Sequence, residues 1–223
     1  MEKYSIWLRC IELLAVIAVL CVCVMKMRGK GTALYFKIYL CATACYTLFL
    51  LYDIIAVFCR IMQLPVDIGD IGALGCGAFL FSANFGQMDG LVDERKKSFL
   101  ARRCIALLAP VVLLALFCSL IFTSNAALSF KLPGIVPILS GIFASYYHLK
   151  HLLLPVDPLG LLKIVRPGNI LALLFLLFNT LFMGASVAGY IIVKEIAGIL
   201  AAGFICTMSV CSVKEAKKWE MSI

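Results

Sequence analysis

The sequence predicts an all-α integral membrane protein, a bundle of seven transmembrane helices with its N-terminus outside and its C-terminus cytoplasmic. Hydrophobic residues make up 64% of the 223 residues and charged residues only 14%, whereas soluble globular domains are about 45–50% apolar and about 25% charged. Disordered chains are poor in the apolar residues that are abundant here. Apolar runs of about 20 residues, long enough to cross a bilayer as a helix, recur along the chain. We therefore expect residues 1–223 to form a single transmembrane domain, with no soluble domain.

Charges and helix-breaking residues divide the chain into seven predicted spans. The fifth is the shortest and carries Pro137 together with both histidines. The sixth and seventh lie so close in sequence that only a tight turn near Ile191–Lys194 can join them. The predicted spans are Ile6–Met25, Ala33–Cys59, Ile68–Met88, Ala101–Thr123, Gly134–Leu153, Asn169–Tyr190 and Glu195–Val213.

The lysines and arginines divide unevenly between the two sides of the predicted bundle, and this gives the orientation. Fifteen of the 20 basic residues fall on one side. Cytoplasmic loops carry the excess of Lys and Arg, so we expect the rich side to face the cytoplasm, with the chain in a plasma (inner) membrane. That side holds Lys26, Arg28, Lys30, Lys37, Arg95, Lys96, Lys97, Arg102, Arg103, Lys150, Lys163, Arg166, Lys214, Lys217 and Lys218; the other holds Lys3, Arg9, Arg60, Lys131 and Lys194.

The net charge of +8 is mostly a consequence of this topology. Basic loops beside the bilayer meet anionic lipid headgroups, and no loop is long enough to form a docking surface for nucleic acid. One cytoplasmic stretch has a pattern of its own, because prolines interrupt Leu154–Pro158. The following Leu159–Arg166 is either a short helix lying along the membrane surface or a plain loop.

The sequence gives no positive indication of a cofactor, a metal or an enzyme. Nearly all cysteines fall inside apolar spans and none forms a CxxC pair, so they are expected to be small packing residues. His148 and His151 either make a polar interfacial helix end or bind a metal with a third ligand. The last span lacks a lysine for a retinal-type Schiff base. No nucleophile, base and orienting group occur together.

Ionisable residues inside a membrane are costly and therefore indicate function. Tyr39, Tyr46, Asp53 and Arg60 follow one another at seven-residue steps along the second span, a spacing that drifts only about 20° per step and makes one narrow stripe. Glu12 lies about 21 Å, and Asp53 about 24 Å, along the helix from the nearest cytoplasmic lysine at 1.5 Å per residue. The two carboxylates are therefore predicted at similar depths, in the outer third of the membrane.

Two interpretations of these residues remain open. In the first, Arg9 pairs with Glu12 and Arg60 satisfies Asp53 or Asp67, which makes a structural ion-pair network. In the second, an outward-facing acidic pocket walled by tyrosines binds a cation or a cationic small ligand. The candidate ligand-binding residues are Glu12, Tyr39, Tyr46, Asp53, Arg60, Asp67 and Asp70.

Polar side chains also occur deeper in the predicted bundle. Ser82, Asn84 and Gln87 end the third span, and Asn179 lies in the middle of the sixth. Amides at such positions hold helices together by hydrogen bonds. Asn84 and Asn179 are alternatively the lining of a path that continues inward from the acidic pocket.

These observations favour a receptor-like or sensor module that binds a cationic small ligand outside. It would signal through a cytoplasmic partner, which Asp89–Arg103 and the tail Val213–Ile223 would contact. The alternatives are a small secondary transporter or channel for a cation or cationic solute, and a membrane scaffold subunit. A transporter requires a polar route through the whole bilayer.

Overall fold

A computed structural model describes residues 2–28, 33–59, 68–89, 99–123, 133–155 and 160–220. Helices take 94% of these residues, and none of them lies in a strand. The all-α prediction is therefore confirmed.

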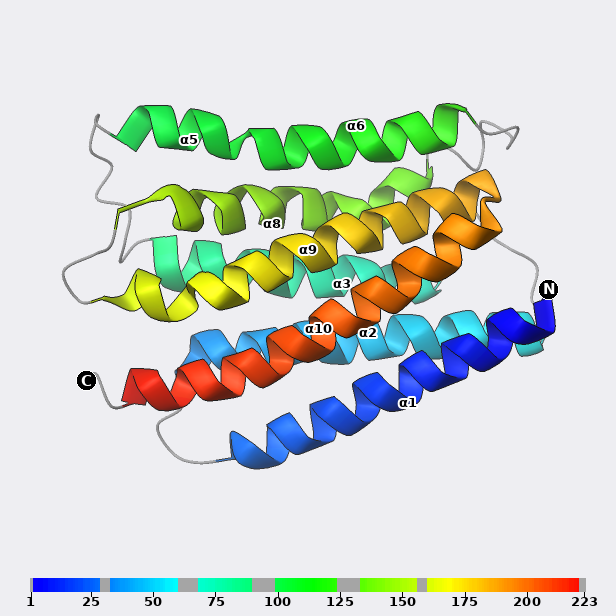
Figure 1. The fold of residues 1–223 in the computed structure, drawn as a ribbon, viewed down its shortest axis with the longest axis horizontal. Coiled ribbons are helices and arrows are strands. Elements are labelled where there is room, and N and C mark those ends of the chain that lie inside the picture. Colours follow the sequence, from blue (N-terminus) through cyan, green and yellow to red (C-terminus); the bar gives the residue numbers. More distant parts are fainter. Residues whose placement is uncertain are drawn as a thin grey trace.

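The helices lie side by side along the long axis of the molecule and run in alternating directions (Figure 1). We call the end at which α1 begins the N-terminal end of the bundle and the opposite end, at which α10 finishes, the C-terminal end. The elements are α1 (Glu2–Lys26), α2 (Leu34–Phe58), α3 (Ile68–Ser82), η1 (Ala83–Asp89), α5 (Leu100–Ala106), α6 (Leu108–Phe122), η3 (Pro133–Ile135), α8 (Val136–Leu153), α9 (Leu161–Ala188) and α10 (Ile191–Glu220).

Six stretches of the described residues are helical, long enough and apolar enough to cross a membrane, whereas the sequence predicted seven. They are Ile6–Lys26, Leu34–Ala56, Ile68–Gly86, Leu100–Phe122, Leu162–Ala188 and Ile191–Trp219. The expected fifth span, α8, is not among them. Its second half carries Tyr146, Tyr147, His148, Lys150 and His151, which lower its mean hydropathy.

Small residues let neighbouring helices approach closely. A Cβ on Gly72 of α3 would lie 2.9 Å from the Cys45 carbonyl oxygen of α2. A Cβ on Gly77 would run into the backbone of Ser140 and Gly141 on α8, and the Ser140 hydroxyl donates to the Leu74 carbonyl at 2.6 Å. Gly72 therefore has the packing role expected of small residues in membrane helices.

Two segments around the ends of α9 differ from the prediction. α9 begins at Leu161 and continues through Pro167, so most of Leu159–Arg166 belongs to a long helix instead of lying along a membrane surface. Burial of Leu162 and Val165 in the core explains the difference. The tight turn after α9 is at Gly189, whose φ of 77° favours glycine, while Ile191–Lys194 already form the first turn of α10.

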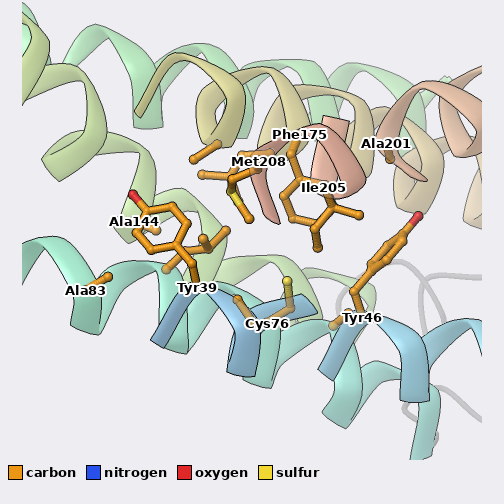
Figure 2. Close-up of a cluster of buried hydrophobic side chains, with 14 of the residues drawn as sticks. Tyr39, Tyr46, Cys76, Ala83, Ala144, Phe175, Ala201, Ile205 and Met208 are labelled. Atoms are coloured by element: carbon orange, nitrogen blue, oxygen red, sulfur yellow. The ribbon is translucent and has the colours of Figure 1, made fainter. Parts of the chain in front are cut away.

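The middle of the bundle is an apolar layer between two tyrosines of α2. Figure 2 shows Tyr39 and Tyr46 on either side of a group of buried apolar side chains, with their hydroxyl groups pointing away from each other. Phe175 packs edge-on against Tyr46, with ring centroids 5.2 Å apart. The layer includes Cys76, Phe175, Ile205 and Met208, each at most 1% exposed.

Candidate functional site

Near the N-terminal end of the bundle, one guanidinium is held among three carboxylates from three helices. Arg9 Nη1 of α1 donates to Glu12 Oε2 at 2.6 Å, and Nη2 donates to Glu195 Oε2 of α10 at 2.9 Å. Asp53 Oδ2 of α2 lies 3.8 Å from Arg9 Nε, close enough for an ion pair but not for a hydrogen bond. We call Arg9, Glu12, Asp53 and Glu195 the arginine cluster.

The cluster is largely removed from solvent. The side chains of Arg9 and Glu12 are 3% and 5% exposed, and those of Glu195 and Asp53 are 18% and 24% exposed. Burying a charge is costly unless it is paired and hydrogen-bonded. Asp53 and Glu195 therefore keep part of their surface exposed, whereas Arg9 and Glu12 are buried.

An aromatic ring and a glycine complete the surroundings of Arg9. The Arg9 guanidinium carbon lies 4.6 Å from the centroid of the Phe182 ring, a cation–π contact, and Lys194 Nζ lies 5.4 Å from the same centroid. A Cβ on Gly198 of α10 would overlap the guanidinium, so glycine provides the space in which Arg9 lies. Among the residues that the structure describes, the printed contacts bring three carboxylates and the cations of Arg9 and Lys194 together here.

Two buried atoms of the cluster are left without a hydrogen bond. Neither Arg9 Nε nor Glu12 Oε1 has a hydrogen-bond partner among the residues that the structure describes. Buried polar groups are nearly always satisfied by protein, water or ligand. One unpaired donor and one unpaired acceptor therefore face this site.

The structure brings only part of the predicted site together. Glu12 and Asp53 both reach Arg9, and the predicted Arg9–Glu12 pair is confirmed. Tyr46 is buried in the apolar layer, and Asp70 is half-buried in the first turn of α3. Arg60 and Asp67 lie outside the described residues, so the expected pairing of Arg60 with Asp53 or Asp67 stays a prediction.

Sequence reasoning did not include Glu195. Its position could have been found, since it was predicted to begin the seventh span on the same side of the membrane as Glu12 and Asp53. What the sequence could not show is that α10 packs along α1, which brings Glu195 to Arg9.

A second polar cluster lies toward the C-terminal end and is made mainly of neutral groups. Asn84 Nδ2 of η1 donates to Asn169 Oδ1 of α9 at 3.1 Å, and the Tyr39 hydroxyl donates to the same oxygen at 3.3 Å. His148 Nδ1 lies 2.8 Å from both Asn84 Nδ2 and Asn169 Oδ1. An amide nitrogen only donates and an amide oxygen only accepts, so each tautomer of His148 satisfies one of these neighbours. With His151, these residues form the amide–imidazole cluster.

The edge of this cluster is charged. His151 Nδ1 donates to Asn84 Oδ1 at 2.7 Å, and His151 Nε2 lies 3.3 Å from Asp89 Oδ1, which is also paired with Lys150 Nζ. Burial raises the pKa of Asp89, but hydrogen bonds from His151 and Lys150 outweigh burial and hold the pKa below its usual value. Asp89 is therefore held ionised at neutral pH.

Both histidines lie at the polar end of α8, as predicted, next to Lys150 and Asp89. Their side chains are fully buried, because η1 and α9 cover that face of α8; the interfacial position stays a prediction. In the part of the chain that the structure describes, no group of three His, Cys, Asp or Glu residues could hold a metal ion.

Asn84 and Asn179, the two amides predicted to line an inward path, differ in their surroundings. Asn84 lies in the amide–imidazole cluster, but the described residues give Asn179 Oδ1 no hydrogen-bond partner. The Thr43 and Ser209 hydroxyls are hydrogen-bonded at 2.7 Å near the layer. Between Tyr39 and Tyr46, the described residues include the buried apolar side chains of Phe175, Ile205 and Met208.

Comparison with protein-family models, with curated proteins and with solved structures found no match to this chain. The class of the protein therefore follows from its helices alone. Six apolar helices of spanning length are compatible with an integral, multi-pass membrane protein.

Proposed function

We propose that this chain is a receptor-like membrane module of seven spanning helices, which binds a small cationic ligand at the arginine cluster and acts through a cytoplasmic partner. It binds its ligand and does not transform it. The observation that carries the proposal is a cluster of three carboxylates around Arg9 in which Glu12 is buried with an unpaired oxygen, while Asp53 and Glu195 are partly exposed. A bound cation would balance this charge and occupy the unpaired Glu12 Oε1.

The proposal counts α8 as a spanning helix in addition to the six apolar ones. Its 18 residues extend about 27 Å at 1.5 Å per residue, close to the thickness of a hydrocarbon core of about 30 Å. The polar residues that lower its hydropathy include His148, Lys150 and His151, which are buried against other helices. Inward-facing polar groups do not prevent a helix from spanning.

The orientation of this proposal follows the positive-inside rule. The arginine cluster then faces outward, and the amide–imidazole cluster lies toward the cytoplasm, expected to be that of a plasma (inner) membrane. The cytoplasmic partner would contact Asp89–Arg103 and Val213–Ile223, parts of which lie outside the described residues.

The apolar layer supports a receptor over a transporter. A transported cation would have to pass Phe175, Ile205 and Met208, which are fully or almost fully buried and offer no polar side-chain atoms other than a thioether. Moving a charge through such a layer is unfavourable by several kcal/mol. We therefore expect ligand binding without net transport.

Binding and uptake measured on the same protein test this proposal. Wild type in nanodiscs should bind methylammonium or guanidinium saturably, while proteoliposomes take up neither ion. Asp53→Asn and Glu195→Gln should weaken binding. Glu220→Gln is the control, because it makes the same change at the other end of α10.

Two results would contradict the proposal. Uptake that is lost in Asp53→Asn would make the chain a transporter. Absence of binding, with Asp53→Asn lowering only thermal stability, would make the arginine cluster a structural ion-pair network.

A further inference from the structure

We infer that the ligand of the arginine cluster carries a guanidinium group and binds by taking the place of the Arg9 guanidinium. This inference rests on the proposed function and narrows its ligand from small cations in general to planar ones with three hydrogen-bonding edges. Arg9 would then be an internal occupant that closes the site when the ligand is absent.

The surroundings of Arg9 are already shaped for a planar cation. The Phe182 ring lies against the guanidinium, with its centroid 4.6 Å from the guanidinium carbon. Gly198 leaves the space that the guanidinium fills, and a single Cβ there would overlap it. Aromatic stacking and flat, fork-like hydrogen bonding distinguish guanidinium from ammonium groups.

Arg9 fills this site incompletely. Its two terminal nitrogens each reach one carboxylate, at 2.6 Å to Glu12 and 2.9 Å to Glu195. Its third nitrogen, Nε, is 3.8 Å from Asp53 and has no hydrogen-bond partner among the described residues. Because Nε is attached to the side chain, the guanidinium of Arg9 cannot turn freely to meet all three carboxylates.

A free guanidinium group lacks this restriction. Its three nitrogens carry six N–H groups in one plane, and the cluster presents three carboxylates from three helices. Such an ion can direct one edge to each carboxylate, including the unpaired Glu12 Oε1. A larger ligand with a terminal guanidinium group would fit in the same way, if the rest of the molecule extended past the exposed parts of Asp53 and Glu195.

Displacement of Arg9 would change how α1 is held. α1 packs mainly against α2 and α10, and Arg9 is the side chain that ties α1 to Asp53 on α2 and Glu195 on α10. A released Arg9 near the end of a helix can extend to the membrane surface. Ligand binding would therefore loosen α1 at the N-terminal end of the bundle, which gives the receptor two states.

The test uses Arg9→Ala, which removes the internal occupant, in the full chain in nanodiscs. Guanidinium chloride at about 10 mM, far below the molar concentrations that denature proteins, should raise the thermal midpoint of this variant. Methylammonium is charged but not planar, and urea is planar but uncharged. Neither should change the thermal midpoint of this variant appreciably. Arg9→Ala/Gly198→Ala keeps every carboxylate but fills the hollow, and it should lose the response.

Wild type provides a second measurement that does not depend on the variant folding. It should bind guanidinium about tenfold more tightly than methylammonium, the factor that one well-formed interaction of about 1.4 kcal/mol supplies. Glu195→Gln should reduce this preference. Arg9→Gln, which keeps a polar side chain, replaces Arg9→Ala if the latter does not fold.

The outcomes separate this inference from the proposed function. Equal binding of guanidinium and methylammonium by wild type, with no selective rescue of Arg9→Ala or Arg9→Gln, would overturn the inference and leave a general cation receptor. A guanidinium-induced rise of the thermal midpoint that persisted in Arg9→Ala/Gly198→Ala would also overturn it, because guanidinium would then not bind in the space beside Gly198. Absence of binding by any cation to wild type and variants would overturn both proposals.

Discussion

The two buried polar clusters lie toward opposite ends of one bundle and are built on opposite chemistry. The arginine cluster consists entirely of formal charges, with Arg9 at its centre. The centre of the amide–imidazole cluster consists of amides, a tyrosine hydroxyl and an imidazole, and among the described residues the ion pair of Lys150 with Asp89 lies at its edge, beside His151. Charges attract over several ångströms with little regard to angle, whereas amides and imidazoles must align donors with acceptors.

The contrast between ionic contacts and aligned hydrogen bonds limits what each cluster can do. In the inferred binding mode, the arginine cluster exchanges the Arg9 guanidinium for a bound planar cation that the same carboxylates and the Phe182 ring can hold. The amide–imidazole cluster connects η1, α8, α9 and α2 through specific donor and acceptor pairs, so it holds four elements in one arrangement. The proposed ligand binding therefore concerns the first cluster, whereas the hydrogen bonds of the second position helices.

Loss of the central cation should produce the largest effect of any single substitution considered. Arg9→Met substitutes an unbranched apolar side chain for arginine and leaves the buried carboxylate of Glu12 without its cationic partner. Removing one member of a buried ion pair costs about 3–5 kcal/mol. Unfolding by SDS titration in mixed micelles measures this loss.

Lys37→Met is the control for this substitution, since it removes a positive charge from an exposed position of α2 and should stay within about 0.5 kcal/mol of wild type. If both variants lost the same stability, the arginine cluster would not be the ionic centre of the bundle's N-terminal end.

The second prediction concerns the hydrogen-bonded cluster. Asn84→Leu removes the amide that joins His148, His151 and Asn169, and it leaves several fully buried polar atoms unsatisfied. Each such group costs about 1–3 kcal/mol, and we expect a total loss of about 3 kcal/mol because some atoms can regain partners. The same SDS titration gives the value.

Asn179→Leu is the matched control, since Asn179 is also a buried amide but its Oδ1 has no hydrogen-bond partner among the described residues. We expect it to change stability by less than about 1 kcal/mol. A loss as large as that of Asn84→Leu would mean that burial of an amide, and not its network, determines the effect.

The third prediction tests the space around Arg9. Gly198→Ala places a methyl group where the guanidinium lies, and overpacking of this kind costs about 1–3 kcal/mol. Gly203→Ala makes the same change on the same helix at a position with nothing within 4 Å. It should stabilise the helix by up to about 1 kcal/mol, so opposite signs are expected in thermal unfolding. Equal changes in stability for the two variants would contradict the claim that Gly198 provides the space in which Arg9 lies.

The sequence was sufficient for much of the fold because composition and apolar runs determine it. The helical class follows from the 64% hydrophobic content, and most predicted spans match observed helices. α8 was counted by position and not by hydropathy, and the structure does not establish it as a span. The sixth span was predicted to begin at Asn169, whereas α9 begins at Leu161 and continues through Pro167, because burial of Leu162 and Val165 favours a continuous helix.

The candidate site was only partly predictable. Local spacing was enough for the Arg9–Glu12 pair, which lies within one turn of α1. Glu195 and the amide–imidazole cluster depend on contacts between residues as far as 186 positions apart, and one sequence carries no information on which helices pack together. The burial of His148 and His151 by η1 and α9 could not be predicted for the same reason, since it is a tertiary effect.

The last and smallest prediction concerns pH and the charged edge of the amide–imidazole cluster. The pKa of Asp89 is lower in the folded chain than its usual value of 3.8, so its ionised form stabilises the fold. A lowered folded pKa gives stability that is present above the unfolded pKa and is lost as pH falls through the folded pKa. Because Asp89 is about a quarter exposed, Asp89→Asn should cost only about 1 kcal/mol near neutral pH.

Thermal unfolding of wild type and Asp89→Asn between pH 3 and 8 checks this. The difference between the two proteins should be constant from about pH 5 to 8 and should shrink below about pH 4 as Asp89 becomes protonated. No comparable change is expected from the same substitution at a solvated surface aspartate, whose pKa is the same in both states. A difference that persisted at pH 3 would show that Asp89 acts through packing and not through its charge, and the contrast between an ionic edge and a neutral centre would then not hold for this cluster.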